Sequence, residues 1–293
     1  MKAILLSAAA IAAIAGPALA KSPEVEIEHA VARVVVIVED RADVAVEIEQ
    51  GSSRLPQLRV ERRGDEVRID GGLGRRIAGV GMGDSINNCR AGPDNTRPGV
   101  GASVEVRDLG RINLEDAPLI VIRSPRDVNV SAGGAVFGSV GRGATSIDLS
   151  SGGCGDWVVA NTDGPVIVRS GGSGAMRLGT SRSLDAALGG SGELLAGSTG
   201  TLELALGGSG KAIVAEVNGD ADIAIGGSGE VDIRRGRVPN LSISIGGSGD
   251  VDFGGAAGDV DVSIAGSGDI RVAEATGSVS RSIVGSGDIR IGR

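Results

Sequence analysis

Aromatic side chains are nearly absent from this sequence of 293 residues, which contains two phenylalanines, one tryptophan and no tyrosine. A globular core usually takes much of its volume from aromatic side chains. Here the core has to be filled by Ile, Val, Leu and Ala, while glycine occurs 51 times. This composition is typical of many thin, similar layers rather than of one large interior.

Histidine and cysteine are scarce as well, with His29 the only histidine and Cys89 and Cys154 the only cysteines. No CxxC motif is present, which disfavours a zinc or redox site. In an exported chain the cysteines predict a disulfide between Cys89 and Cys154, with two free thiols as the alternative. The spacing of the two cysteines along the chain does not give the distance between them in the fold, on which disulfide formation depends.

Positive charge is in deficit, since the sequence has 29 Lys and Arg residues but 37 Asp and Glu residues, and its formal net charge is −8. An acidic surface without a basic cluster argues against nucleic acid and against anionic lipid headgroups as partners.

The first twenty residues have the three parts of an export signal. Lys2 supplies the positive start, Ala3 to Ala15 form an apolar core, and Ala18-Leu19-Ala20 is a small-x-small cleavage site. The apolar run is shorter than the ~18 residues that span a bilayer. Lys21 rather than cysteine follows the cut, so no lipid anchor is indicated. The sequence predicts a signal peptide at residues 1–20, with a retained anchor as the alternative. No later transmembrane segment is predicted. The expected location is the periplasm, or the outside of the cell including its surface.

A four-residue phrase, Gly-Gly-Ser-Gly, returns at a nearly constant spacing in the second half of the chain. Its serines are Ser173, Ser191, Ser209, Ser228, Ser248, Ser267 and Ser286, and each is followed by a glycine: Gly174, Gly192, Gly210, Gly229, Gly249, Gly268 and Gly287. The steps from serine to serine are 18, 18, 19, 20, 19 and 19 residues, and Cys154 takes the serine's place one period earlier. A fixed period of this length indicates stacked structural repeats.

Alternating apolar residues flank each phrase. Three and five residues before the serine stand pairs such as Leu206 and Leu204, Ile225 and Ile223, and Ile245 and Ile243; three and five after it stand Val231 and Ile233, Val251 and Phe253, and Ile270 and Val272. This pattern predicts two strands per period with alternate residues facing inward. Stacking at ~4.8 Å then gives a single-stranded parallel β-helix of 18–20 residues per coil. The repeated glycines and serines are predicted to form its corners, because glycine accepts φ > 0.

The last coil departs from the inward pattern. Arg281 stands five residues before Ser286, where earlier coils carry Ile, Val, Leu or Ala. A charge is tolerable on an exposed terminal layer, so Arg281 is predicted to be a C-terminal cap. A second column, of acidic residues, follows the phrases at Asp156, Glu193, Glu230, Asp250, Asp269 and Asp288. We interpret it as a solvated edge, with weak cation binding as an alternative, because the order of residues does not match a calcium-binding nonapeptide roll.

Four regions are predicted along the chain: the signal peptide at 1–20, a strand-rich region at 21–70, a glycine-rich irregular loop at 71–103, and the β-helix at 104–293. Short strands are expected at Val34–Val38, Val44–Ile48, Leu58–Val60 and Val67–Ile69. The loop contains oxygen-rich residues at Asp84, Asn87, Asn88, Asp94 and Asn95, whose spacing matches no calcium loop. We interpret it as a solvated loop tethered through Cys89.

The repeat resembles a known bacterial family. Its pattern of alternating Ile, then Gly-Gly-Ser-Gly-Asp-Val, is clearest at Leu241–Phe253 and Val260–Val272, and the segment Ile120–Val128 precedes the repeats. It is similar to the family called putative auto-transporter adhesin, head GIN domain, over roughly residues 104–293. The resemblance implies a single-stranded parallel β-helix in an exported or surface protein, and it carries no catalytic motif to transfer.

The sequence therefore favours a non-enzymatic exported protein of the cell envelope, an adhesin or structural binding module that binds through a β-helix face or the 71–101 loop. Two alternatives remain: a periplasmic enzyme or accessory protein acting on envelope polysaccharide, and a periplasmic scaffold for another protein. No histidine lies in the repeats to complete a Ser/His/Asp set, and no carboxylate pair stands out for hydrolysis. No catalytic residue, cofactor or metal ligand is predicted. Envelope protein or polysaccharide is the expected partner, and the oligomeric state stays open.

Overall fold

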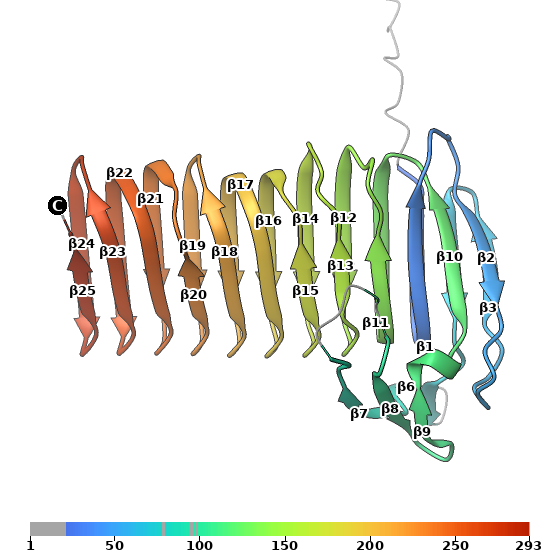
Figure 1. The fold of residues 1–293 in the computed structure, drawn as a ribbon. Coiled ribbons are helices and arrows are strands. Elements are labelled where there is room, and N and C mark those ends of the chain that lie inside the picture. The colour runs from blue at the N-terminus through green and yellow to red at the C-terminus, as the bar shows by residue number, and fades with distance from the viewer. Residues whose placement is uncertain (1–21, 78–79, 94–96, 98, 293) are drawn as a thin grey trace, which may run out of the picture.

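The structure is a computed structural model that describes residues 22–77, 80–93, 97 and 99–292, with the side chains of 75–84 left aside. The predicted signal peptide lies outside these residues. Strands make up most of the described chain, which contains no α-helix and a single short 3-10 helix, η1 (Leu114–Asp116). Figure 1 shows them as an elongated stack of coils, with a smaller sheet region projecting near the N-terminal end. The all-β parallel solenoid predicted from the repeats is confirmed.

The stack is built from strands that pair in parallel with the strands of the next coil. They are β10 (Leu119–Ser124), β11 (Asp127–Val140), β12 (Ser146–Ser151), β13 (Trp157–Val159), β14 (Pro165–Ser170), β15 (Ala175–Leu178), β16 (Ser181–Leu188), β17 (Glu193–Leu206), β18 (Lys211–Val217), β19 (Ala221–Ile225), β20 (Glu230–Ile233), β21 (Arg237–Ile245), β22 (Asp250–Gly266), β23 (Asp269–Ala275), β24 (Val279–Gly285) and β25 (Asp288–Ile291).

The register between coils repeats the spacing of the glycine phrases. Leu188 pairs with Leu206, Leu206 with Ile225, and Ile225 with Ile245. These partners lie 18, 19 and 20 residues apart, as the serine steps predict. Each coil thus places the same position of its sequence over the same position of the previous one.

Identical positions stack their aliphatic side chains into one continuous core. Ile223, Ile225, Ile243 and Ile245 are each 2% exposed or less, and so are Val231 and Ile233 after the corner. Full burial of such a side chain contributes about 1.5–3 kcal/mol. Trp157 and Phe253 are buried in the same core, so the scarce aromatics fill the interior rather than the surface.

The N-terminal region forms the first layers of the same stack. β1 (Glu24–Val38) pairs in parallel with β10 and β11, and with β4 (Glu66–Asp70). Two antiparallel pairings lie at this end, β2 (Ala45–Glu49) with β10 and β3 (Arg59–Arg63) with β4. The four strands expected here are present, although β1 begins ten residues before the expected Val34. The predicted division at residues 70 and 103 stays a prediction about folding units. The first and last of these regions share one sheet, because β1 pairs with β10 and β11.

The segment expected to be an irregular loop contains strands, so this expectation is wrong in detail. β5 (Gly74–Ile77) pairs with β6 (Val80–Asp84), and β7 (Ile86–Arg90) forms an antiparallel sheet with β8 (Ser103–Val106) and β9 (Gly110–Asn113). We call residues 86–113 the side sheet. A second hydrophobic cluster joins it to the stack, where Val104, Ile112 and Leu114 pack against Val31 and Phe137.

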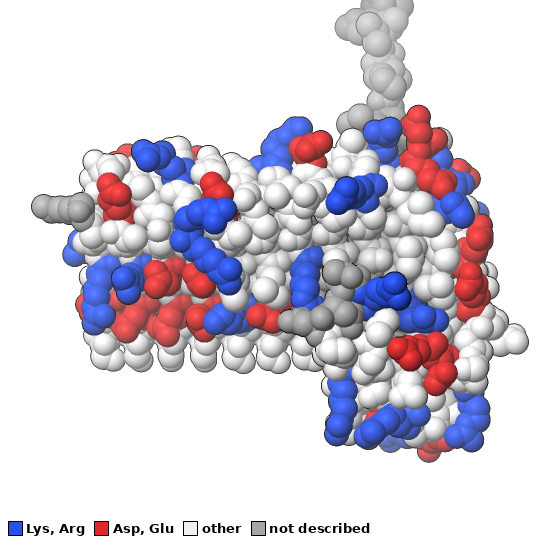
Figure 2. Space-filling model, viewed as in Figure 1, with Lys and Arg blue, Asp and Glu red and all other residues white. Residues whose placement is uncertain are grey.

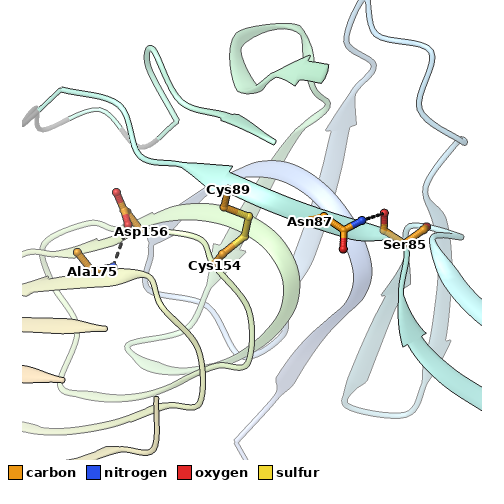
Figure 3. Close-up of a disulfide and its surroundings, with 6 residues drawn as sticks. All are labelled: Ser85, Asn87, Cys89, Cys154, Asp156 and Ala175. Atoms are coloured by element: carbon orange, nitrogen blue, oxygen red, sulfur yellow. Dashed lines mark hydrogen bonds between the residues drawn. A yellow bond between two sulfur atoms is a disulfide. The ribbon is translucent and has the colours of Figure 1, made fainter. Parts of the chain in front are cut away.

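A disulfide between Cys89 and Cys154 fastens the side sheet to the stack, confirming the predicted pair. Figure 3 shows Cys89, which lies on β7, next to the corner of the stack that carries Cys154. Their Cα atoms are 6.1 Å apart, and 65 residues separate them in sequence. The cysteine that replaces a corner serine is therefore the one that meets the neighbouring sheet.

The corner glycines are required by close contact between coils. A Cβ atom on Gly172, Gly190 or Gly208 would lie 1.6–2.1 Å from a glycine carbonyl oxygen of the previous coil. None of these three has a φ in the left-handed region, so the expected reason, φ > 0, is wrong for them. The first glycine of the phrase is different, because a Cβ on Gly207 would meet nothing closer than 3.9 Å. Ala265 and Val284 occupy this first position in the last two coils.

Candidate functional site

A groove of about 880 Å³ runs along the stack over the strands that precede the corners. Its lining comes from matching positions of successive coils: Pro165, Val166, Ile167, Ser183, Leu184, Asp185, Thr201, Leu202, Glu203, Asp220, Ala221, Asp222, Asn240, Leu241, Ser242, Asp259, Val260, Asp261, Ser278 and Ser280. The buried members face the core, and the polar members alternate with them and face outward. We call this surface the groove.

Six carboxylates line the groove, and none of the lining residues is a lysine or arginine. Asp185, Glu203, Asp222 and Asp261 stand six residues before a corner serine, and Asp220 and Asp259 stand eight before. Parallel pairing aligns Asp185 with Glu203 and Glu203 with Asp222. Neighbours in such a ladder lie about 4.8 Å apart. The groove is therefore a row of negative charge along the axis of the stack.

Two of these carboxylates are held by neighbouring coils. Asp220 Oδ1 accepts a hydrogen bond of 2.9 Å from Asn240 Nδ2. Asp259 Oδ1 accepts bonds from the Ser278 hydroxyl at 2.7 Å and the Ser278 backbone N–H at 2.8 Å. The bond from the Ser278 hydroxyl, followed by that from its N–H, lowers the pKa of Asp259. These contacts fix the carboxylates in place but leave their charge unneutralised.

A second acidic surface lies on the strands that follow the corners, and some of its carboxylates are also held by the next coil. Asp156, Asp250 and Asp269 each accept a backbone N–H bond from the next coil, at 2.9, 2.9 and 3.0 Å. The expectation of a merely solvated edge is therefore incomplete for these residues, which connect one coil to the next. We call this side the paired surface, and it holds a smaller cavity of about 250 Å³.

Basic side chains neutralise part of the paired surface. Lys211 Nζ lies 2.8 Å from Glu230, and Arg290 Nε lies 2.8 Å from Asp288. The hydrogen bond with Glu230 raises the pKa of Lys211. Figure 2 shows a face of the stack on which acidic and basic side chains lie beside one another over the C-terminal coils. The structure therefore presents two acidic columns. Basic side chains pair with part of one column, and none lines the other.

The predicted corner residues separate these two surfaces. The corner serines from Ser173 to Ser286 are exposed, and the glycines that follow them, from Gly174 to Gly268, are buried. The backbone N–H of Ser209 donates to the Gly190 carbonyl oxygen. The corner serines that donate to the previous coil in the same way are Ser173, Ser228, Ser248, Ser267 and Ser286. No binding role is assigned to the serines.

Arg281 lies on β24, opposite Val262 of the preceding coil. Every residue of β24 is exposed. This position is on the terminal layer of the described stack. Its role as a cap stays a prediction about stability and association.

The groove offers binding chemistry: carboxylates, hydroxyls and one amide along a shallow channel. Within residues 22–77, 80–93, 97 and 99–292, no three His, Cys, Asp or Glu side chains are grouped so as to hold a metal ion. Of the oxygen-rich loop residues, Asn88 donates to Glu105 and Asn87 to the Ser85 carbonyl, while Asp94 and Asn95 lie outside the described residues. In that same part of the chain no helix has the length and apolar character needed to span a bilayer.

Sequence comparison finds a match to a known family in the C-terminal third of the chain. Residues 197–292 match the family model described as putative auto-transporter adhesin, head GIN domain, which confirms the resemblance over those residues. No curated protein matches the chain. A crystal structure of a putative lipid binding protein from Parabacteroides distasonis is similar in fold, with a TM-score of 0.51, 18% sequence identity and 93% of each chain covered.

Proposed function

We propose, from the head GIN repeat matched at residues 197–292, that the chain is a non-enzymatic exported protein of the cell envelope and that a face of its solenoid binds an envelope ligand. The observation that carries the proposal is the groove, which extends over seven successive coils and contains six carboxylates without a cation in its lining. A long, regular and polar channel is suited to an extended ligand rather than to a small one.

The solenoid supports this function by its rigidity. Because the backbone of each coil is hydrogen-bonded to its neighbours, the positions from which the outward side chains project are fixed in the free protein. A preorganised surface loses little conformational entropy on binding. An adhesive or structural binding module benefits from that property, and a periplasmic or cell-surface location follows from the export signal predicted at residues 1–20.

Binding to arrays of glycans and envelope proteins tests this proposal. We expect the purified mature protein to bind an envelope component, and the Asp222→Arg variant to bind it less, because the charge lies in the middle of the groove. Asp252→Arg, on the paired surface, is the matched control and should bind as the parent does. Cell fractionation should recover the protein outside the cytoplasm.

Two outcomes would overturn the proposal. Release of product from a glycan, abolished by substitution of one carboxylate, would make the protein an enzyme. Recovery of the protein only in the cytoplasm would remove the envelope as its place of action.

A further inference from the structure

We infer that the groove binds an extended, cationic polypeptide segment, with lysine or arginine side chains reaching its carboxylates. This inference rests on the proposed function and names the ligand class of the same surface. Its starting point is a contrast between the two acidic columns. Both lie on the same coils, but basic side chains pair with carboxylates in only one of them.

The groove carboxylates have no cationic partner among the described residues. The ion pairs of neighbouring coils, such as Lys211 with Glu230 and Arg235 with Glu216, involve no residue that lines the groove. Asp185, Glu203, Asp222 and Asp261 form none. Asp185, Glu203 and Asp222 lie on successive coils, about 4.8 Å apart, and repel one another. A polycation that binds them gains the attraction and also offsets this repulsion.

The length of the groove favours a chain over a small cation. From Asp185 to Asp261 there are four coil steps, or about 19 Å. In an extended peptide the side chains of one face recur every ~6.8 Å, so four alternate residues span about 20 Å. A seven-residue segment with a basic residue at every second position therefore matches the carboxylate row in length.

The absence of aromatic side chains disfavours a glycan in the groove. Sugar-binding surfaces commonly offer an aromatic ring on which the sugar stacks, and the aromatic residues Phe137, Trp157 and Phe253 are each at most 1% exposed. Hydroxyls and an amide, from Ser183, Thr201 and Asn240, remain to bond the peptide backbone. Charge complementarity thus selects a basic peptide.

Fluorescence anisotropy with a labelled peptide of eight residues, alternating lysine and threonine, tests the inference on the mature chain. We expect saturable binding that weakens as salt is raised to about 150 mM, because exposed charges are screened. An alternating glutamate and threonine peptide should not bind. Neutralising three groove residues, Asp185→Asn, Glu203→Gln and Asp222→Asn together, should weaken the binding by about tenfold, since each exposed ion pair contributes modestly.

The paired surface supplies a matched control with the same change in charge. In the triple variant Asp232→Asn, Glu193→Gln and Asp252→Asn, affinity should change by less than about threefold, because these residues lie outside the groove. Both variants should keep the melting temperature of the parent within a few degrees, which shows that they fold.

Equal loss of affinity in the two triple variants would overturn the inference, because it would show attraction to total charge alone. No binding of the lysine peptide, or binding of a neutral glycan or of Ca²⁺ in its place, would overturn it as well. A ligand found on the envelope arrays and lost in Asp222→Arg would then still support the proposed function, so the two failures are distinguishable.

Discussion

At the scale of single residues, the inner glycines of the corners are fixed by contact between backbones. Two glycines of each phrase lie directly over the carbonyl oxygens of the previous coil, whereas the first glycine has room for a methyl group. The repeat therefore contains glycines of two kinds that look identical in sequence.

We expect Gly208→Ala to destabilise the stack by about 3 kcal/mol, because a Cβ there would lie 2.1 Å from the Gly190 oxygen and the backbone would have to move. Gly207→Ala should cost no more than about 0.5 kcal/mol, since its nearest neighbour is at 3.9 Å. Thermal melting followed by circular dichroism measures both. Similar melting temperatures for the two variants would contradict the contact argument.

This difference could only partly be predicted from the sequence. The substitutions Ala265 and Val284 mark the first position as tolerant, and that signal was available. The reason why the inner positions need glycine could not be predicted, because it depends on the distance between two stacked coils and not on the local sequence of one corner. Local propensity suggested φ > 0, which the structure shows for Gly285 but not for Gly172 or Gly208.

At the scale of elements, hydrogen bonds from one coil to a carboxylate of the coil before it link successive layers. Asp259 receives two such bonds from Ser278, at the start of the last coil. Because they lower the pKa of Asp259, the ionised carboxylate favours the folded state. That contribution is present above the ordinary aspartate pKa and is lost as the pH falls through the lowered value.

We therefore expect the last coil to lose protection against hydrogen exchange as the pH falls below the ordinary aspartate range. Ser278→Ala should raise the pKa of Asp259 toward its ordinary value, leaving only the backbone N–H bond. Carboxyl NMR titration measures that change. Ser280→Ala, two residues further along the chain on β24, is the control and should leave the titration of Asp259 unaltered.

The disulfide joins two elements that are held together otherwise by the second hydrophobic cluster. It closes a loop of 65 residues, for which the chain-entropy estimate is about 4 kcal/mol. We expect the double variant Cys89→Ser and Cys154→Ser to melt at a lower temperature and to exchange amide hydrogens faster in the side sheet. Reductant should reproduce the change in the parent and have no effect on the variant. A parent whose melting ignores reductant would contradict this.

The strands that flank the repeated glycine phrases could be predicted from the sequence, and the strands outside the repeats could be predicted only in part. Strands such as β19 and β20 follow from alternation about each serine, and their register follows from the serine steps. The first ten residues of β1 were missed, since they pair with β11 and β4 rather than forming a repeat of their own. Strands β5 to β7 were missed because Gly, Asn and Arg interrupt their alternation.

At the scale of the molecule, the two ends of the described stack differ. Antiparallel pairs close the N-terminal end, while β24 at the other end is exposed throughout, with Ile283 at 45% and Val284 at 71%. Edge strands of this kind promote association unless a charge interrupts them. Arg281 is the charge on this strand, which also carries the exposed apolar side chains of Val279, Ile283 and Val284.

We expect Arg281→Ile to leave the stack folded but to increase self-association, because it adds an apolar side chain to an exposed edge. Ile225→Asp should destabilise the stack by more than about 4 kcal/mol, since Ile225 is 2% exposed and its replacement would bury a charge. Light scattering and thermal melting measure the two effects. A lower melting temperature for Arg281→Ile than for Ile225→Asp would contradict the assigned layout.

The groove had a sequence signal that the corner-centred pattern did not exploit. Asp185, Glu203, Asp222 and Asp261 recur six residues before a serine, as regularly as the acidic column that follows the corners. What the sequence could not show is which column contains ion pairs. That depends on contacts such as the one between Lys211 and Glu230 of the next coil, and the one between Arg290 and Asp288 on the same strand.

The parallel register between coils also determines how the molecule would respond to tension. The disulfide bridges the N-terminal layers up to Cys154, whereas the coils after it are connected only by the chain and by noncovalent contacts. A pulling force on the C-terminal end would act on the hydrogen bonds between one pair of coils at a time, so the coils would separate one after another. Each coil that peels away would release roughly 60 Å of chain. The stack would extend stepwise under load, while the crosslinked part keeps its length.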